Sequence, residues 1–215
     1  LGAFTSILTR DGTHITPPAG VQVTTGNSFT VATGALRLRQ ACAEAGLDPR
    51  PEDATLAVIG AGGNIGAGLA VHLTRGASRF RRVLLVGRNR SRLEAARNRL
   101  HTYHRTQGDE EPPPELIVTT DLADLRRADV VAVAINTNEP LIYAQHLKAE
   151  GPVVIADIST PTAVSAEASA LPHVTVVALA GLVTVPDAPW FIMSSQSPPG
   201  MAFCCAAEAM MMGLD

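Results

Sequence analysis

The chain has 215 residues, 46% of them hydrophobic, so it can bury the core of one medium-sized domain or slightly more. Its net charge of −3 argues against general nucleic-acid binding, and no apolar run is long enough for a membrane span. The three cysteines, Cys42, Cys204 and Cys205, match neither a disulfide framework nor a metal site. These features predict a cytoplasmic protein that binds no metal.

Residues 1–25 have the pattern of the end of a separate lobe. Short extended runs at 4–8 and 21–24 flank a turn that is rich in Gly and Pro. Because the sequence also begins without Met, we expect a piece of a longer polypeptide. Residues 1–25 would then be the remnant of an N-terminal substrate lobe.

A connecting helix and a linker are expected over residues 26–54. The apolar spacing predicts a helix at 28–45, which Gly46 ends, and a short Pro-containing linker follows at 48–52. Four side chains should lie near one side of this helix: Val31, Leu36, Leu38 and Cys42.

The strongest motif is an apolar strand pattern that runs directly into the glycine-rich segment 60–66, after which a helical pattern begins. Strand, glycine-rich turn and helix form the first unit of a Rossmann domain. Gly60 permits the tight turn, and Gly66 permits close packing of the helix on the strand. The first N–H groups of the helix attract phosphate, although a glycine turn that serves only packing is the alternative. The residues predicted to hold the pyrophosphate are Gly60, Gly62, Gly63, Asn64 and Ile65.

Strand and helix patterns alternate through residues 55–199. The strand patterns are continuous Val, Ile, Leu and Ala runs, as in a parallel sheet that is covered on both faces. We therefore predict an α/β fold with a doubly wound, Rossmann-type parallel sheet and assign 55–199 to the NADP-binding domain. The expected strands are 55–60, 82–87, 115–119, 129–135, 152–157 and 174–179. The expected helices are 63–75, 90–104, a short turn at 121–127, 140–149 and 161–169.

The residues after the second strand favour NADPH over NADH. An NAD-binding domain usually places Asp or Glu here to accept hydrogen bonds from the ribose, whereas this chain continues with Gly87 and Arg88. A guanidinium suits a 2′-phosphate as a forked donor, so Arg88 is assigned to that phosphate, with Asn89 and Arg90 beside it. A solvated basic helix is the alternative.

Polar residues also follow the fourth strand. Asn136 and Thr137 come at the carboxyl end of the predicted sheet, where cofactor and substrate meet in doubly wound folds. Both are predicted to contact the cofactor, and an ordinary turn is the alternative.

The C-terminal segment 200–215 carries the remaining reactive group. Its Met- and Ala-rich pattern predicts a buried helix at 200–213 that packs back on the active-site cleft. No Tyr-x-x-x-Lys pair or His/Asp set is present in the sequence, but the thiolate of Cys204 or Cys205 could attack an acyl thioester. A cysteine that serves only as a small buried hydrophobe is the alternative.

Several segments, taken in order along the chain, resemble the long-chain acyl-(acyl carrier protein) reductase family. The segments are 24–32, Asn64-Ile65-Gly66, 85–89, 190–193 and 203–210. The cysteine of that family falls on Cys205. The resemblance implies that Cys205 is the acyl-accepting nucleophile, that NADPH is the hydride donor and that the product is an aldehyde. It also implies an acyl carrier protein or coenzyme A as the acyl donor.

The chain departs from that family in two stretches and lacks most of its N-terminal lobe. Residues 180–185 lack the Glu-His pair that the family has after the last strand, and residues 157–161 replace a Gly-rich stretch. These departures leave the cofactor assignment intact but affect the assignment of the substrate.

The turn before the connecting helix also resembles that of shikimate-dehydrogenase-like enzymes. We expect Thr25, Asn27 and Ser28 to face the nicotinamide end of the cleft. Ser28, or backbone N–H groups near Gly181, would stabilise the developing oxyanion, and Gly181 is also placed at the cofactor. Two alternatives stay open: a carbonyl reductase without covalent catalysis, and a catalytically silent NADP-binding module.

Overall fold

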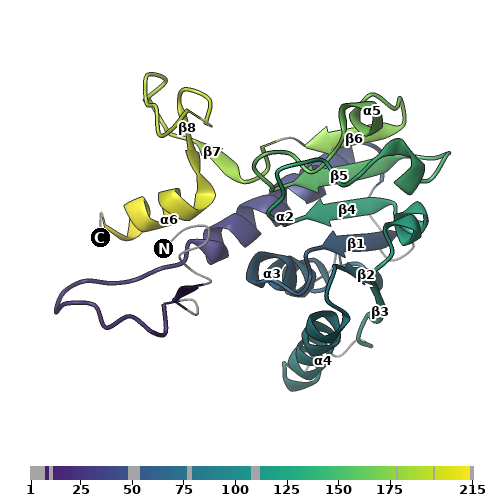
Figure 1. Ribbon diagram of the computed structural model, residues 1–215, viewed down its shortest axis with the longest axis horizontal. Helices are drawn as coiled ribbons and strands as arrows, with labels where there is room; N and C mark the ends of the chain where they lie inside the picture. Colours follow the sequence, from purple (N-terminus) through teal and green to yellow (C-terminus); the bar gives the residue numbers. More distant parts are fainter. Residues whose placement is uncertain are drawn as a thin grey trace.

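The computed structural model shows an α/β domain with a small extension at its C-terminal end (Figure 1). No helix of the described residues is long and apolar enough to cross a membrane. The structure describes residues 8–9, 12–47, 54–76, 79–107, 112–177, 179–195 and 197–213.

Six parallel strands form the central sheet in the spatial order β3-β2-β1-β4-β5-β6. The register places Thr55 of β1 opposite Arg82 of β2, and Leu56 of β1 opposite Val130 of β4. The chain runs outward from β1 through β2 to β3 and then returns to place β4 on the other side of β1, as in doubly wound Rossmann-type folds. The predicted fold class is therefore confirmed. The predicted strands are all present: β1 (Thr55–Ile59), β2 (Arg82–Val86), β3 (Glu115–Thr119), β4 (Val130–Val133), β5 (Val153–Asp157) and β6 (Val174–Val177).

Both faces of the sheet are buried, which explains the continuous apolar runs of its strands. In β1, Leu56 and Val58 face a core that contains residues of α2, α3 and α4. Ala57 and Ile59 face the opposite core, beneath η1, η2 and α5. The helices are α2 (Asn27–Glu44), α3 (Asn64–Leu73), α4 (Arg90–Thr106), η1 (Leu122–Arg127), η2 (Ala144–His146) and α5 (Ala166–Ser169).

Two predicted helices are largely absent. The prediction at 140–149 retains only the single turn of η2, and the prediction at 161–169 retains only α5. The two segments pair with each other instead, because the N–H groups of Leu141 and Ile142 both donate to the Ala163 carbonyl at 2.8 and 3.0 Å. These long-range hydrogen bonds replace the helical ones that local propensity favours.

Helix α2 packs against α3 and the end of β5. Its buried side includes Leu38 and Cys42, as predicted, but Leu36 is 67% exposed, so that part of the prediction is wrong. Gly34 lies on the buried side, where an added Cβ would be 2.6 Å from the Ile158 Cδ1 atom. Small residues therefore bring α2 close to the sheet.

After β6 the chain leaves the sheet and forms the extension. Strands β7 (Leu182–Thr184) and β8 (Met201–Phe203) pair antiparallel, with Leu182 opposite Phe203. Helix α6 (Cys204–Met212) follows β8 directly. In Figure 1 the extension projects on the side toward which the arrows of β1, β4 and β5 point, which is the carboxyl edge of the sheet.

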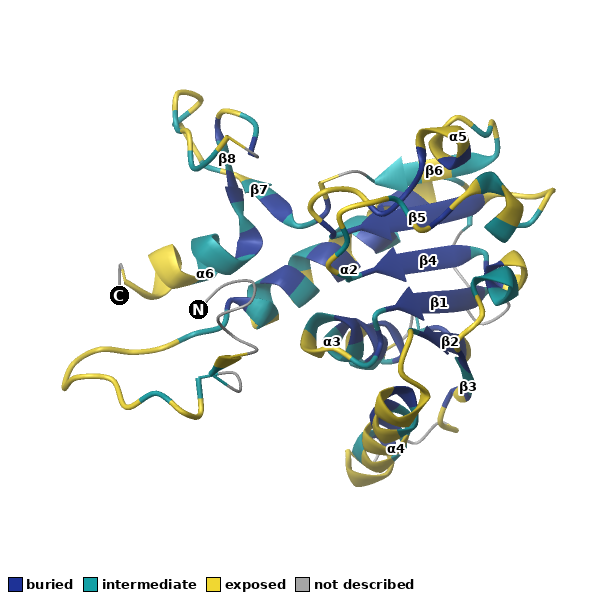
Figure 2. Ribbon diagram, viewed as in Figure 1, coloured by how far each residue is buried: buried dark blue, intermediate teal, exposed yellow. Residues whose placement is uncertain are grey.

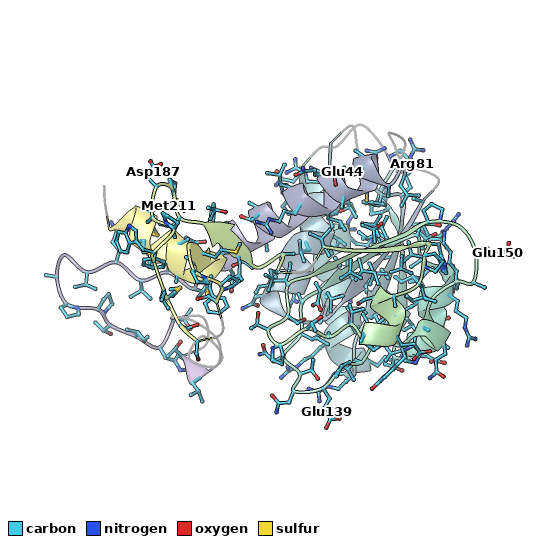
Figure 3. The ribbon with its side chains drawn as sticks, turned by 90° about the horizontal axis from the view of Figure 1, so that it is seen from above. Glu44, Arg81, Glu139, Glu150, Asp187 and Met211 are labelled. Atoms are coloured by element: carbon cyan, nitrogen blue, oxygen red, sulfur yellow. The ribbon has the colours of Figure 1, made fainter. Side chains whose placement is uncertain are left out.

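The prediction of a buried helix at 200–213 is confirmed for the helix, which spans Cys204–Met212, but not for its burial. The segment starts as strand β8, and in α6 only Cys204 is buried. The side chains of Met210, Met211 and Met212 are 43–45% exposed, and Figure 2 shows the last turns of α6 coloured as exposed. Figure 3 places Met211 on the projecting extension, well away from Glu150 on the α/β body. The end of α6 stays exposed because the helix packs mainly against α2, β7 and β8.

The N-terminal segment 12–25 has no strand of its own. The predicted extended run at 21–24 is a loop in which Val21 is 52% exposed, and the predicted run at 4–8 lies mostly outside the described residues. Thr24, near the end of this segment, contacts α6 through the Glu208 carboxylate.

Candidate functional site

The candidate site lies at the carboxyl ends of the neighbouring strands β1 and β4, beyond which the chain continues to opposite faces of the sheet. Gly60 follows β1 with φ +86°, a left-handed conformation that favours glycine. An added Cβ at Gly60 would lie 2.2 Å from the carbonyl oxygen of Ala134, just beyond β4. The predicted residues Asn136 and Thr137 follow two and three positions after Ala134 in the chain. Ligands of doubly wound folds bind at this kind of crevice.

The glycine-rich loop is a compact turn with a helix start at its end. The N–H of Gly60 donates to the Val86 carbonyl at 2.9 Å, and the N–H of Gly63 donates to the Gly60 carbonyl at 2.9 Å. An added Cβ at Gly66 would lie 2.3 Å from the Gly60 carbonyl oxygen. The glycine at 66 therefore permits the close approach of α3 to the loop, as its position in the motif predicts.

The start of α3 suits a pyrophosphate. Gly63 is the N-cap residue of α3. It has no side chain, and among the described residues there is no side-chain cap hydrogen bond at this position. Asn64 is exposed at the first position of the helix, followed by the half-buried Ile65. An added Cβ at Gly62 would lie 3.1 Å from the Arg92 Cβ, whereas at Gly63 it would meet only the Gly60 oxygen at 3.3 Å. Gly63 is thus the more open of the two glycines proposed for close approach of phosphate.

The turn after β2 presents a basic surface. Arg88 is exposed, and Asn89 caps α4 by accepting the Arg92 N–H at 3.0 Å. Arg90 lies 3.8 Å from Glu94 and is partly neutralised by it. Within the described residues, Arg88 has no ion-pair partner, so its guanidinium is available to an anion. Asn89 is explained by its capping role alone.

Other predicted residues have local structural roles. The Thr137 hydroxyl donates to the Glu139 carbonyl at 2.5 Å and closes a short turn, while Asn136 is exposed. The buried Asp157 at the end of β5 accepts the N–H groups of Ser159 and Ala163 at 2.9 and 2.7 Å. Asp157 therefore shapes the loop beside the site.

The β7–β8 pair returns the chain to the site. The Cys204 N–H donates to the Gly181 carbonyl at 2.9 Å. Gly181 itself lies against the loop after β5, because an added Cβ there would be 3.0 Å from the Ile158 carbonyl oxygen. The start of α6 is thus held at the carboxyl edge of the sheet by backbone contacts.

Cys205 contacts the N-terminus of α2. Gly26, the N-cap residue of α2, has φ +70°. An added Cβ at Gly26 would lie 2.3 Å from the Cys205 Cα and 2.4 Å from its Cβ. The structure therefore brings Cys205 close to Asn27 and Ser28, residues that are separated from it by most of the chain.

The two adjacent cysteines differ in environment. Cys204 is fully buried, and burial raises the pKa of its thiol, while an interaction with Thr33 opposes that shift. Cys205 is half-buried. Access to a substrate favours Cys205 as the nucleophile of the pair.

A surface pocket of about 350 Å³ lies between the first turns of α2 and α3. Ser28 and Asn64, both predicted site residues, line it together. His72 also lines the pocket. Its pKa is lowered by burial and then by the nearby charges of Arg39 and Arg75, a shift that favours the uncharged imidazole. The remaining lining residues are Asn27, Val31, Ala32 and Gly68.

Glu208 is a residue of this region to which the sequence assigned no role. Its carboxylate accepts hydrogen bonds from the Thr24 hydroxyl and from the Phe29 N–H. Its position three residues after Cys205, on the same side of a helix, is the signal that could have indicated it.

The fold and the loop geometry define a Rossmann domain of the NAD(P)-dependent oxidoreductase type. Residues 42–185, more than half of the chain, match the family model described as shikimate / quinate 5-dehydrogenase. The chain belongs to the shikimate / quinate 5-dehydrogenase family. A search of curated protein sequences found no match.

The chain is similar to several solved structures. Glutamyl-tRNA reductase from Methanopyrus kandleri is 26% identical, with a TM-score of 0.49 over 68% of this chain and 34% of that one. Shikimate 5-dehydrogenase from Thermus thermophilus is 19% identical, with a TM-score of 0.44 over 68% and 48%. Iminosuccinate reductase of Paracoccus denitrificans is 23% identical, with a TM-score of 0.38 over 65% and 39%. The chain thus spans about a third of the length of the Methanopyrus protein.

Proposed function

We propose that this protein is an NADPH-dependent reductase that converts an acyl thioester to an aldehyde through an acyl group held on Cys205. The observation that carries the proposal is the contact of Cys205 with Gly26 at the carboxyl edge of a nicotinamide-type Rossmann sheet. Cys205 is half-buried, whereas Cys204 is buried. The resemblance of segment 203–210 to acyl-(acyl carrier protein) reductases supports the same interpretation.

The residues around the loop fit NADPH. The open backbone at Gly63 and the first turn of α3 would hold the pyrophosphate. The exposed Arg88 would pair with the 2′-phosphate. Gly60 and Gly66 shape this cradle, since a Cβ at either position would collide with backbone oxygen. When bound, NADPH supplies a hydride to an acyl carbon.

The covalent chemistry falls to Cys205. Its thiolate attacks the carbonyl carbon of the acyl thioester and forms a new C–S bond. The bond to the carrier sulfur breaks, and the carrier leaves as a thiol after it takes up a proton. Reduction of the Cys205 thioester then breaks the new C–S bond, releases the aldehyde and restores the thiolate. Acyl carrier protein and coenzyme A are the proposed acyl donors.

Ser28 is the proposed donor to the developing oxyanion. It lies two residues after Gly26, which contacts Cys205, and its side chain is exposed toward the pocket between α2 and α3.

A panel assay tests the proposal. NADPH oxidation would be measured with acyl-coenzyme A and acyl-carrier thioesters, alongside ketones and free aldehydes. We expect oxidation with the thioesters and an acyl adduct in the intact mass when NADPH is omitted. Turnover of ketones without any adduct would overturn the proposal, and tight NADPH binding without any turnover would indicate a silent module.

The second candidate is a carbonyl reductase without covalent catalysis. The family match over residues 42–185 favours it, because that family is named for dehydrogenases. This candidate requires that reductase activity be independent of the Cys205 thiol, whereas the thioester reductase requires the thiol.

Arg88→Ala is expected to raise the dissociation constant for NADPH about 10- to 100-fold, as loss of a charge-assisted hydrogen bond to phosphate costs about 1.5–3 kcal/mol. NADH lacks the 2′-phosphate, so its affinity should change little. Fluorescence titration of both cofactors measures this. Arg105→Ala removes an exposed cation from the last turn of α4, the helix that follows Arg88, and serves as the control. Equal loss of affinity for both cofactors would contradict the assignment of Arg88.

A further inference from the structure

Glu208 joins helix α6 to the start of helix α2. Its Oε2 atom accepts the Phe29 N–H at 2.6 Å, and its Oε1 atom accepts the Thr24 hydroxyl. Thr24 in turn accepts the Gly26 N–H at 3.1 Å, so the carboxylate and the turn at 24–29 form one connected set of hydrogen bonds. The contacts link segments about 180 residues apart in the sequence.

The carboxylate takes the place of a missing helix cap. The N-cap residue of α2 is Gly26, which has no side chain and makes no side-chain cap hydrogen bond. An N-cap side chain normally accepts the N–H of the third helical residue, which here is Phe29. Glu208 accepts that N–H from another helix. A negative charge at this end of α2 is also favoured by the helix dipole.

The cap lies beside Cys205. Glu208 follows Cys205 by three residues, so both side chains lie on one side of α6. One turn of α6 thus contacts α2 twice, through the Cys205 backbone at Gly26 and through the Glu208 carboxylate at Phe29. Two contacts one turn apart fix both the position and the rotation of the helix that carries the thiol.

We propose that Glu208 is a positioning residue that holds Cys205 at the N-terminus of α2. The exposed second half of α6 offers little other support, because Met210, Met211 and Met212 are all 43–45% exposed. The consequence for catalysis rests on the proposed thioester reductase function. The attachment itself is a property of the fold that can be measured without substrate.

The test compares Glu208→Ala, Glu208→Gln and the control Glu44→Ala. Gln can still accept the Phe29 N–H and can donate to the Thr24 hydroxyl, whereas Ala can do neither. Glu44 lies exposed at the opposite end of α2, where it accepts a hydrogen bond from Gln40 at 2.9 Å. Its replacement removes a carboxylate from the same helix pair without touching the cap.

Two readouts need no substrate. Glu208→Ala should speed hydrogen exchange of the Phe29 amide about 10-fold or more, because a charge-assisted hydrogen bond is lost. Alkylation of Cys205 by iodoacetamide, followed by peptide mass, should also become several times faster, about 3-fold or more, as α6 opens locally. Glu208→Gln and Glu44→Ala should remain near the wild-type values. Unchanged exchange and alkylation in Glu208→Ala would overturn the positioning role.

A third readout links position to activity. Glu208→Ala should lower kcat for the thioester about 10- to 100-fold, since small displacements of a reacting group have effects of this size. The NADPH dissociation constant should stay within about 2-fold, and Glu208→Gln should restore most of kcat. Unchanged kcat in an active Glu208→Ala protein would overturn the proposal. Altered exchange and alkylation in a protein that turns over no thioester would support the attachment and reject the thioester reductase function.

Discussion

Replacement of Cys205 by Ala is expected to abolish thioester reduction, with a fall in kcat of at least about 1,000-fold, because the acyl group then has no acceptor. The acyl adduct seen by intact mass in the absence of NADPH should vanish as well. The NADPH dissociation constant should not change, because the residues proposed to hold the pyrophosphate and the 2′-phosphate lie in the loop 60–66 and in the turn after β2. Parallel assays of oxidation rate, adduct mass and cofactor binding measure all three.

Cys204→Ala is the matched control. Cys204 is adjacent in sequence but fully buried, and burial raises the pKa of its thiol. Its loss should cost stability through packing and leave the adduct in place. Activity that survives in Cys205→Ala would reject the nucleophile and favour the non-covalent carbonyl reductase. Loss of the adduct in Cys204→Ala, with the adduct retained in Cys205→Ala, would show that Cys204 is the acyl acceptor and would reject the assignment to Cys205.

Gly26→Ala is expected to displace α6 and to reduce thioester turnover about 100-fold. The new Cβ would lie 2.3 Å from the Cys205 Cα, which is backbone and cannot rotate away. The left-handed φ of +70° adds a cost of about 1–2 kcal/mol. Both effects act at the point where α2 meets the thiol-bearing turn.

Gly46→Ala separates these two effects. Gly46 lies just beyond the other end of the same helix with φ +69°, and an added Cβ there would meet nothing within 4 Å. This variant therefore carries the conformational cost of about 1–2 kcal/mol without the collision. Thermal unfolding and kcat are the measurements. Equal behaviour of the two variants would show that the contact of Gly26 with Cys205 does not matter for activity.

The conformation of the predicted nucleotide-binding loop could be predicted from the sequence. Loop 60–66 lies between a strand and a helix. These elements follow one another directly in the sequence, so a local pattern is enough to predict them. The structure confirms that Gly60 adopts a left-handed φ and that Gly66 permits a close approach of α3. That this loop binds a pyrophosphate stays a prediction.

Local patterns were misleading where partners are distant. Residues 140–149 and 161–169 have helical composition, yet the Leu141 and Ile142 N–H groups bond to Ala163 instead of to their own segment. Leu36 has an apolar side chain on a helix whose packing leaves it 67% exposed. Periodicity reports which residues share a side, but not which side another element will cover.

The central sheet could be predicted from local patterns, because β-branched and aliphatic runs of strand length alternate with helical patterns and are typical of a doubly wound layer. Cys205 was singled out through the resemblance of segment 203–210 to acyl-(acyl carrier protein) reductases, and its role as nucleophile stays a prediction. Only the tertiary structure decided where that thiol lies: the pairing of β7 with β8 returns α6 to Gly181, and Gly26 and Glu208 attach it to α2. The contacts of Glu208 join residues about 180 positions apart in the sequence, so no local pattern encodes them.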